Sequence, residues 1–107
     1  MQQLTTEQLK QKINSGENFV LDLFATWCGP CKVMLNNLSK VNESLIKESV
    51  GTPLYSIYKF DIDTDKEFVV NELNIRSVPT IKIYKGGTEV FSKPGVMSPA
   101  EVLNLLN

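Results

Sequence analysis

The 107-residue sequence contains no histidine, only two cysteines and a single tryptophan. A structural zinc site needs about four nitrogen or sulfur ligands, so this composition excludes one. No apolar run approaches the roughly 20 residues that a membrane-spanning helix requires. Lysine and arginine (11) nearly balance aspartate and glutamate (12), and the basic residues form no stripe. The sequence therefore gives no indication of a zinc centre, a membrane span or a nucleic-acid interface.

The N-terminus has no cationic segment followed by an apolar core, as a signal peptide would have. We therefore expect a cytoplasmic, reducing setting, in which a closely spaced cysteine pair is more often catalytic than a permanent crosslink. No linker rich in glycine, serine or proline divides the chain, and 42% of its residues are hydrophobic. The sequence predicts one globular domain over residues 1–107 and, since no large apolar stripe is left unexplained, a monomer.

The two cysteines lie in Trp27-Cys28-Gly29-Pro30-Cys31-Lys32, between a predicted strand and a predicted helix. Random placement would give this spacing only about 2% of the time. Residues i and i+3 share one helix face, so the two Cα atoms would be roughly 5–6 Å apart, close enough for a disulfide. A sulfur at the start of a helix meets free N–H groups and the helix dipole, which stabilise the thiolate. We predict that Cys28 attacks and that Cys31, one turn further in and better buried, resolves.

Two other interpretations of the cysteine pair remain open. A two-thiolate copper(I) carrier would need no further ligand from the chain. A permanent structural disulfide would close a very short loop and add little stability by the chain-entropy account. The spacing and its position between a strand and a helix favour reversible redox chemistry over both.

Asp22 and Lys59 are charged residues inside predicted strands that are largely apolar. Asp22 lies within residues 19–24, whose two faces are apolar, as in a central strand covered on both sides. As a buried carboxyl beneath the dithiol helix, Asp22 would have a raised pKa and could exchange a proton with the cysteines. A solvated position on an exposed face is the alternative. Lys59 lies either at a sheet edge, with its amine in water, or beside Asp22, where it would moderate the pKa of that carboxyl.

Hydrophobic periodicity and capping signals predict the element order α-β-α-β-α-β-β-α. The predicted elements are a helix capped at Thr5 and stopped at 15–18, a strand at 19–24, a helix from the dithiol to about Lys47, a loop at 48–53, a strand at 54–62, a short helix capped by Asp63, a strand at 80–84, a hairpin turn at 85–88, a strand at 89–92 and a helix capped at Ser98. Helix-separated strands imply parallel pairing, and the closing hairpin adds antiparallel strands. We therefore expect an α/β fold, with a central mixed β-sheet flanked by helices on both faces.

With these motifs identified, the sequence closely resembles the thioredoxin family over nearly its whole length. Residues 27–32 match the active-site motif of that family without change. Other segments resemble the strand with a buried aspartate (19–24, at Asp22), the strand end with its lysine partner (59–63, at Lys59) and the cis-proline loop (77–80). Gly86 and Gly95 fall where the family has glycines in the hairpin turn and beside the active site. The resemblance implies a thioredoxin fold.

The sequence also departs from the family pattern. The N-terminal strand of the family looks short or absent, and the segment before the Lys59 strand looks somewhat longer than usual. Asn36 stands where the active-site helix usually has a kinking proline, so we expect a straighter helix. Phe24 stands where many members have a second tryptophan. None of these departures touches the dithiol.

The resemblance implies a general protein-disulfide reductase that acts on disulfide-containing client proteins and is re-reduced by a thioredoxin reductase. Cys28 would attack, Cys31 would resolve the mixed disulfide, and Asp22 with Lys59 nearby would take the proton, directly or through a water. A surface formed by Trp27, Gly29, Pro30, Val78, Pro79 and Gly95 would receive the substrate. The chain would need no cofactor of its own, and it has no G-x-G-x-x-G motif for a nicotinamide. A more oxidising oxidase or isomerase and a non-catalytic partner-binding subunit remain alternatives.

Overall fold

The computed structural model describes residues 1–51 and 53–107. Within these residues the strands are β1 (Gln2–Gln3), β2 (Phe19–Phe24), β3 (Ser56–Asp61), β4 (Thr80–Lys85) and β5 (Thr88–Pro94). The helices are α1 (Thr6–Ser15), α2 (Gly29–Glu48), α3 (Lys66–Asn71) and α4 (Pro99–Leu106), and a short 3-10 helix, η1 (Ile62–Thr64), precedes α3. The loop predicted at 48–53 includes residue 52, which lies outside the described residues. No helix of the described ranges is both long and apolar enough to cross a membrane.

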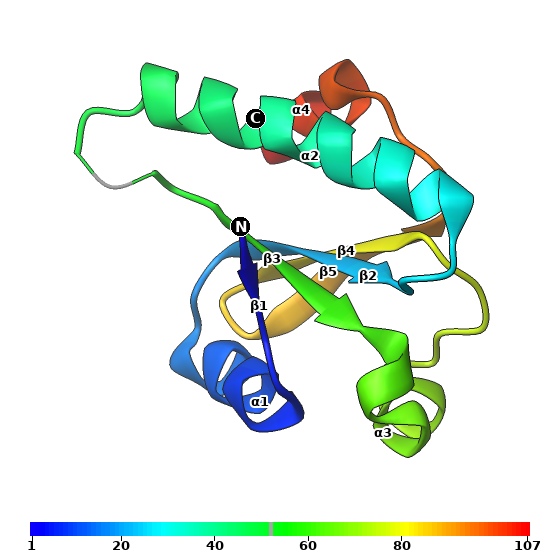
Figure 1. Cartoon of the computed structure of the whole chain (residues 1–107). Helices are drawn as coiled ribbons and strands as arrows, with labels where there is room; N and C mark the ends of the chain where they lie inside the picture. The colour runs from blue at the N-terminus through cyan, green and yellow to red at the C-terminus, as the bar shows by residue number, and fades with distance from the viewer. Residues whose placement is uncertain (52) are drawn as a thin grey trace.

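The strands form one mixed sheet in the order β1-β3-β2-β4-β5 (Figure 1). The parallel pairing expected for helix-separated strands is confirmed for β2 with β3. It is wrong for β4, which follows α3 but runs antiparallel to β2. The six residues of α3 extend only about 9 Å along the helix axis. A six-residue strand is about 20 Å long, so α3 does not carry the chain back along the sheet, and β4 starts near the end at which β3 finishes.

Helices cover both faces of the sheet, with α1 and α3 on one side and α2 and α4 on the other (Figure 1). Each face has its own apolar core. Phe19, Leu21 and Leu23 of β2 belong to one core, and Val20 belongs to the other, which contains the buried side of α2. Since successive strand residues point to opposite faces, Asp22 and Phe24 share the face of Val20. The central strand therefore places a carboxyl beneath the helix that begins at the dithiol.

The local structure agrees with the sequence at the first and last helix caps and differs at the ends of other elements. The capping boxes at Thr5 and Ser98 are confirmed, and α2 continues without interruption past Asn36. The N-terminal strand is present but has only two residues, paired with β3. The cap predicted at Asp63 is wrong, because the intervening η1 moves the start of α3 and makes Asp65 its N-cap. The predicted strand 54–62 is too long, since β3 begins at Ser56.

Lys82 in β4 is a buried lysine, with a side chain only 3% exposed, and it forms an ion pair with Glu89 of β5, which is 42% exposed. Removing Glu89 leaves the buried ammonium of Lys82 uncompensated, whereas an apolar side chain in place of Lys82 leaves only Glu89, which reaches water, and so costs much less. We expect Glu89→Gln to lower the free energy of unfolding by about 2–3 kcal/mol. Lys82→Met is expected to lower it by less than about 1.5 kcal/mol.

Urea unfolding at neutral pH measures both variants. The double variant Lys82→Met/Glu89→Gln is the matched control and should be no less stable than Glu89→Gln alone, because no buried ammonium then remains. Equal losses in the two single variants would contradict this account of the ion pair.

Candidate active site

The dithiol occupies the junction between β2 and α2. Cys28 is the N-cap of α2, with an extended backbone, and Gly29 and Pro30 form the start of the first turn. Proline is tolerated there, because its missing N–H would have no partner within the helix. Cys28 and Cys31 are joined as a disulfide, with Cα atoms 5.3 Å apart. This separation agrees with the one expected from the i, i+3 spacing.

The two cysteines differ in their position on the helix rather than in their burial. We expected Cys31 to be better buried, but the exposed fractions of the two residues are nearly equal, at 4% for Cys31 and 5% for Cys28. The backbone N–H of Cys31 donates a hydrogen bond of 3.2 Å to Cys28 Sγ. A sulfur that accepts an N–H at the N-terminus of a helix is stabilised as a thiolate when the disulfide is reduced. Helix capping therefore distinguishes Cys28 from Cys31.

Asp22 is fully buried in the centre of the sheet, between Lys59 of β3 and Ile81 of β4. Neither carboxyl oxygen has a hydrogen-bond partner in the part of the chain that the structure describes. Burial disfavours the charged carboxylate and raises the pKa of Asp22 to about 7, although the positive charge of Lys59 acts in the opposite direction. The prediction of a buried carboxyl is confirmed, and the solvated alternative is wrong.

Lys59 is the cross-strand neighbour of Asp22. The edge alternative for Lys59 is wrong, since β1 lies outside β3 and pairs Gln3 with Lys59. The side chain is half-buried, and its Nζ lies 5.4 Å from the centre of the Phe24 ring. The charge of Lys59 is therefore held on the same face of the sheet as Asp22.

The residues predicted to receive a substrate come from three parts of the chain. Trp27 is 69% exposed, and its indole N–H donates to the Asp63 carboxylate at 2.8 Å. Val78 packs against the small cluster of Ala25, Cys28 and Cys31, and the Val78–Pro79 peptide bond is cis, as the resemblance implied.

Gly95 directly follows β5 and is hydrogen-bonded to the loop that contains Val78 and Pro79. Its N–H donates to the Pro79 carbonyl at 2.8 Å. With a φ of 96°, Gly95 adopts a backbone conformation that other residues rarely take. The structure therefore brings Trp27 and Val78 to the dithiol and Gly95 to Pro79.

Three residues near the site were not recognised from the sequence. Phe24 and Ile62 pack against the dithiol cluster, and Asp63 binds Trp27. The alternation of β2 could have indicated Phe24, because it shares a face with Asp22. No local signal indicated Asp63, because its partner is 36 residues away. Across residues 1–51 and 53–107, no group of three or more histidine, cysteine, aspartate or glutamate side chains is arranged to hold a metal ion.

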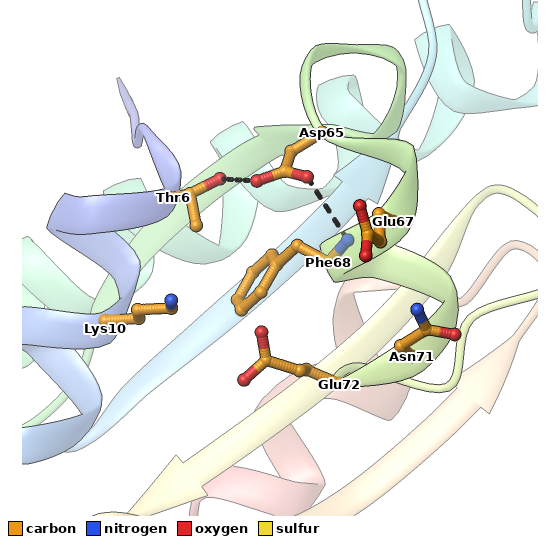
Figure 2. Close-up of a pocket in the computed structure, with 7 residues that line it drawn as sticks. All are labelled: Thr6, Lys10, Asp65, Glu67, Phe68, Asn71 and Glu72. Carbon is orange, nitrogen blue, oxygen red and sulfur yellow. Dashed lines mark hydrogen bonds between the residues drawn. The ribbon is translucent and has the colours of Figure 1, made fainter.

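The pocket in Figure 2 lies between α1 and α3, on the face of the sheet opposite the dithiol helix. Its Asp65 accepts hydrogen bonds from Thr6 Oγ1 at 2.7 Å and from the Phe68 N–H at 3.2 Å, which hold the pKa of that carboxyl below its usual range. These bonds cap α3 and connect it to α1. None of the residues that line the pocket belongs to the candidate active site.

A dithiol at a helix N-terminus, above a buried carboxyl and beside an exposed tryptophan, defines a protein-disulfide oxidoreductase. The Thioredoxin family model matches residues 1–107, and the chain belongs to the thioredoxin family. The predicted thioredoxin fold and the thiol–disulfide reductase function are confirmed by this match and by the curated relatives and solved structures that resemble the chain.

Curated relatives and solved structures agree with this assignment. The chain is 36% identical to Thioredoxin-2 of Saccharomyces cerevisiae over 89 residues, which are 82% of this chain and 77% of that protein. It is 30% identical to a Haemophilus influenzae thioredoxin over 95 residues, or 89% and 82% of the two chains. A chloroplastic thioredoxin z structure superposes with a TM-score of 0.82 at 27% identity, covering 99% of this chain and 90% of the other. A Plasmodium falciparum thioredoxin gives 0.81 at 27% identity, with 99% and 96% covered.

Proposed function

We propose that this protein is a general reductase of protein disulfides, acting as a cytoplasmic monomer and re-reduced by a thioredoxin reductase. The observation that carries the proposal is the position of Cys28 as N-cap of α2, with its Sγ accepting the Cys31 N–H. The Gly29-Pro30 pair between the cysteines resembles the reducing branch of the family. A reducing compartment suits this chemistry, because there the dithiol can be kept reduced.

The reaction proceeds by two thiol–disulfide exchanges. The Cys28 thiolate attacks one sulfur of the client disulfide, forming a mixed disulfide and releasing the other client sulfur as a thiolate. Cys31 then attacks Cys28 Sγ, forms the Cys28–Cys31 disulfide and releases the second client sulfur. Two electrons pass from the dithiol to the client.

Asp22 is the proposed acceptor for the proton that Cys31 loses when it attacks. It lies beneath α2, and its pKa of about 7 makes the carboxylate and the acid similarly populated near neutral pH. Lys59 lies beside it and stabilises the charged form. Because Asp22 lies beneath the helix that begins at the dithiol, with the apolar Ile81 as its neighbour in β4, this carboxyl is the titratable group best placed to serve the resolving step.

The proposed client-binding surface consists of Trp27, Gly29, Pro30, Val78, Pro79 and Gly95. Val78 lies two residues before β4, and its backbone N–H and C=O form no hydrogen bond with the described residues. An extended client segment could therefore pair with Val78, as in strand addition, while Trp27 offers an exposed aromatic face. Client proteins that present a disulfide in an extended segment fit this surface best.

The reduction potential of the Cys28–Cys31 pair tests the proposal. Thioredoxin is known to have a reduction potential of about −270 mV, and we expect a similar value for this chain. The oxidised and reduced fractions are measured by alkylation after equilibration with a thiol–disulfide buffer, with Cys28→Ser/Cys31→Ser as the blank. About −180 mV or higher would instead indicate an oxidase or isomerase. If no internal disulfide formed, a partner-binding subunit would be the better assignment.

A further inference from the structure

Phe24 contacts both Lys59 and the dithiol cluster. Its ring lies 5.4 Å from Lys59 Nζ, and it also packs against the cluster of Ala25, Cys28 and Cys31. Phe24 and Asp22 are two residues apart in β2, on the same face, and Lys59 is the cross-strand partner of Asp22. The lysine charge therefore lies against an aromatic ring, next to the buried carboxyl and close to the dithiol.

We propose that Phe24 is a positioning residue, whose ring holds the Lys59 ammonium beside Asp22 and thereby controls how readily Asp22 accepts the proton of Cys31. The inference rests on the proton role that the proposed function gives to Asp22. Lysine has a long flexible stem and a strongly hydrated ammonium, so without a contact it would extend into water. The face of an aromatic ring attracts a cation and restricts that movement.

The other groups around Asp22 leave Lys59 as the charge that acts on it. In β4 the neighbour is Ile81, and β1 presents the neutral Gln3 to Lys59. Asp61 lies two residues beyond Lys59, pairs in register with Phe24 and accepts the Asp63 N–H at 2.9 Å, but the charge that shifts the pKa of Asp22 is that of Lys59. No ion pair between Lys59 and a carboxylate is present among the described residues.

The remaining charges near the site do not face Asp22. On α2, the charged residue next to the dithiol is Lys32, which is exposed, and the two cysteines form an uncharged disulfide. Lys82 of β4 lies on the opposite face of the sheet, because it alternates with Ile81, and it is paired with Glu89. The position of the Lys59 ammonium is therefore the variable that Phe24 can control.

Titration of the Asp22 side-chain carboxyl by NMR tests the proposal in the oxidised protein, where no thiol titrates. The midpoint of the unaltered chain is expected at about pH 7. Phe24→Leu keeps an apolar side chain but removes the ring face, so the ammonium moves away and the midpoint rises by about 0.5–1 pH unit. Phe24→Trp is the conservative control: it keeps an aromatic ring face, so the Asp22 midpoint should stay at its original value. Thermal unfolding verifies that both variants are folded.

A double-variant comparison separates positioning from a general packing effect. Lys59→Gln is expected to raise the midpoint by about 1 pH unit, and adding Phe24→Leu to it should cause no further change, because the ring then has no cation to hold. A Phe24→Leu midpoint equal to the original one, a Lys59→Gln midpoint that does not move, or a full additional shift in the double variant would each overturn the proposal.

The pH dependence of mixed-disulfide resolution distinguishes this inference from the proposed function. The mixed disulfide of Cys28 with a coloured thiol is formed at low pH, and release of the thiol is followed after a jump to higher pH. The resolution profile of Phe24→Leu should shift upward with the Asp22 midpoint. If Asp22→Asn kept the original profile, the proton role of Asp22 would fail. If Asp22→Asn altered the profile and Phe24→Leu did not, only the positioning role would fail.

Discussion

Replacing Cys31 by serine is expected to leave a chain that attacks client disulfides but remains joined to them through Cys28. The N-terminus of α2 stabilises the Cys28 thiolate and is unaffected by the change, while the sulfur that would displace the client is missing. Multiple-turnover reduction should fall by about three orders of magnitude or more, because the two cysteines act as a unit. Non-reducing gels and mass spectrometry of the mixed disulfide, together with a turnover assay, measure this result.

Cys28→Ser is the matched control for this experiment. It keeps Cys31, which is as buried as Cys28 but does not cap the helix. We expect it to lose turnover to the same extent without accumulating a mixed disulfide. A mixed disulfide that formed through Cys31 as fast as through Cys28 would show that the capping position does not determine which cysteine attacks.

Asp22→Asn is expected to remove from the free energy of unfolding a pH-dependent contribution of about 4 kcal/mol. Burial raises the pKa of Asp22 from 3.8 to about 7 in the folded chain. The folded state therefore holds the proton more tightly than the unfolded state does. The stability that this proton contributes is fully present below pH 3.8 and is lost as the pH rises through about 7. Relative to Asp22→Asn, the unaltered chain should thus become progressively less stable between about pH 4 and pH 8.

Urea unfolding of the oxidised chains at a series of pH values measures this difference. Subtracting the two curves removes the titration of the other groups, which are common to both chains. Glu43→Gln, which changes an exposed carboxyl of α2, is the control and should give a nearly constant difference. A constant difference for Asp22→Asn would mean that the carboxyl is solvated in the folded protein, contrary to its complete burial.

The features of the candidate site that the sequence predicted correctly are those whose residues lie close together in the chain. The i, i+3 spacing of the cysteines is converted by α2 into a Cα separation of 5.3 Å, whatever the rest of the chain does. The two apolar faces of residues 19–24 indicated a central strand, and the alternation of that strand placed Asp22 on one face. The capping boxes at Thr5 and Ser98 depend on residues three positions apart and were predicted for the same reason.

The features that were missed or wrongly predicted depend on contacts between distant segments. The direction of β4 follows from how η1 and α3 carry the chain past the end of the sheet. The choice between the two alternatives predicted for Lys59 depended on such contacts too, because strand register places it beside Asp22 and the neighbouring β1 keeps it from the edge. The ion pair of Lys82 with Glu89 depends on how β5 pairs with β4.

The sequence by itself determined the chemistry that this protein carries, namely a dithiol at the N-terminus of a helix, an apolar strand with one carboxyl and a proline at the start of another strand. These features depend on residues within one turn or one strand of each other, so local backbone geometry is sufficient. Only the tertiary structure decided the surroundings that tune this chemistry, including the buried state of Asp22, the Phe24–Lys59 contact and the bond from Trp27 to Asp63. Burial and charge pairing depend on segments far apart in the sequence, and the fold alone brings those segments together.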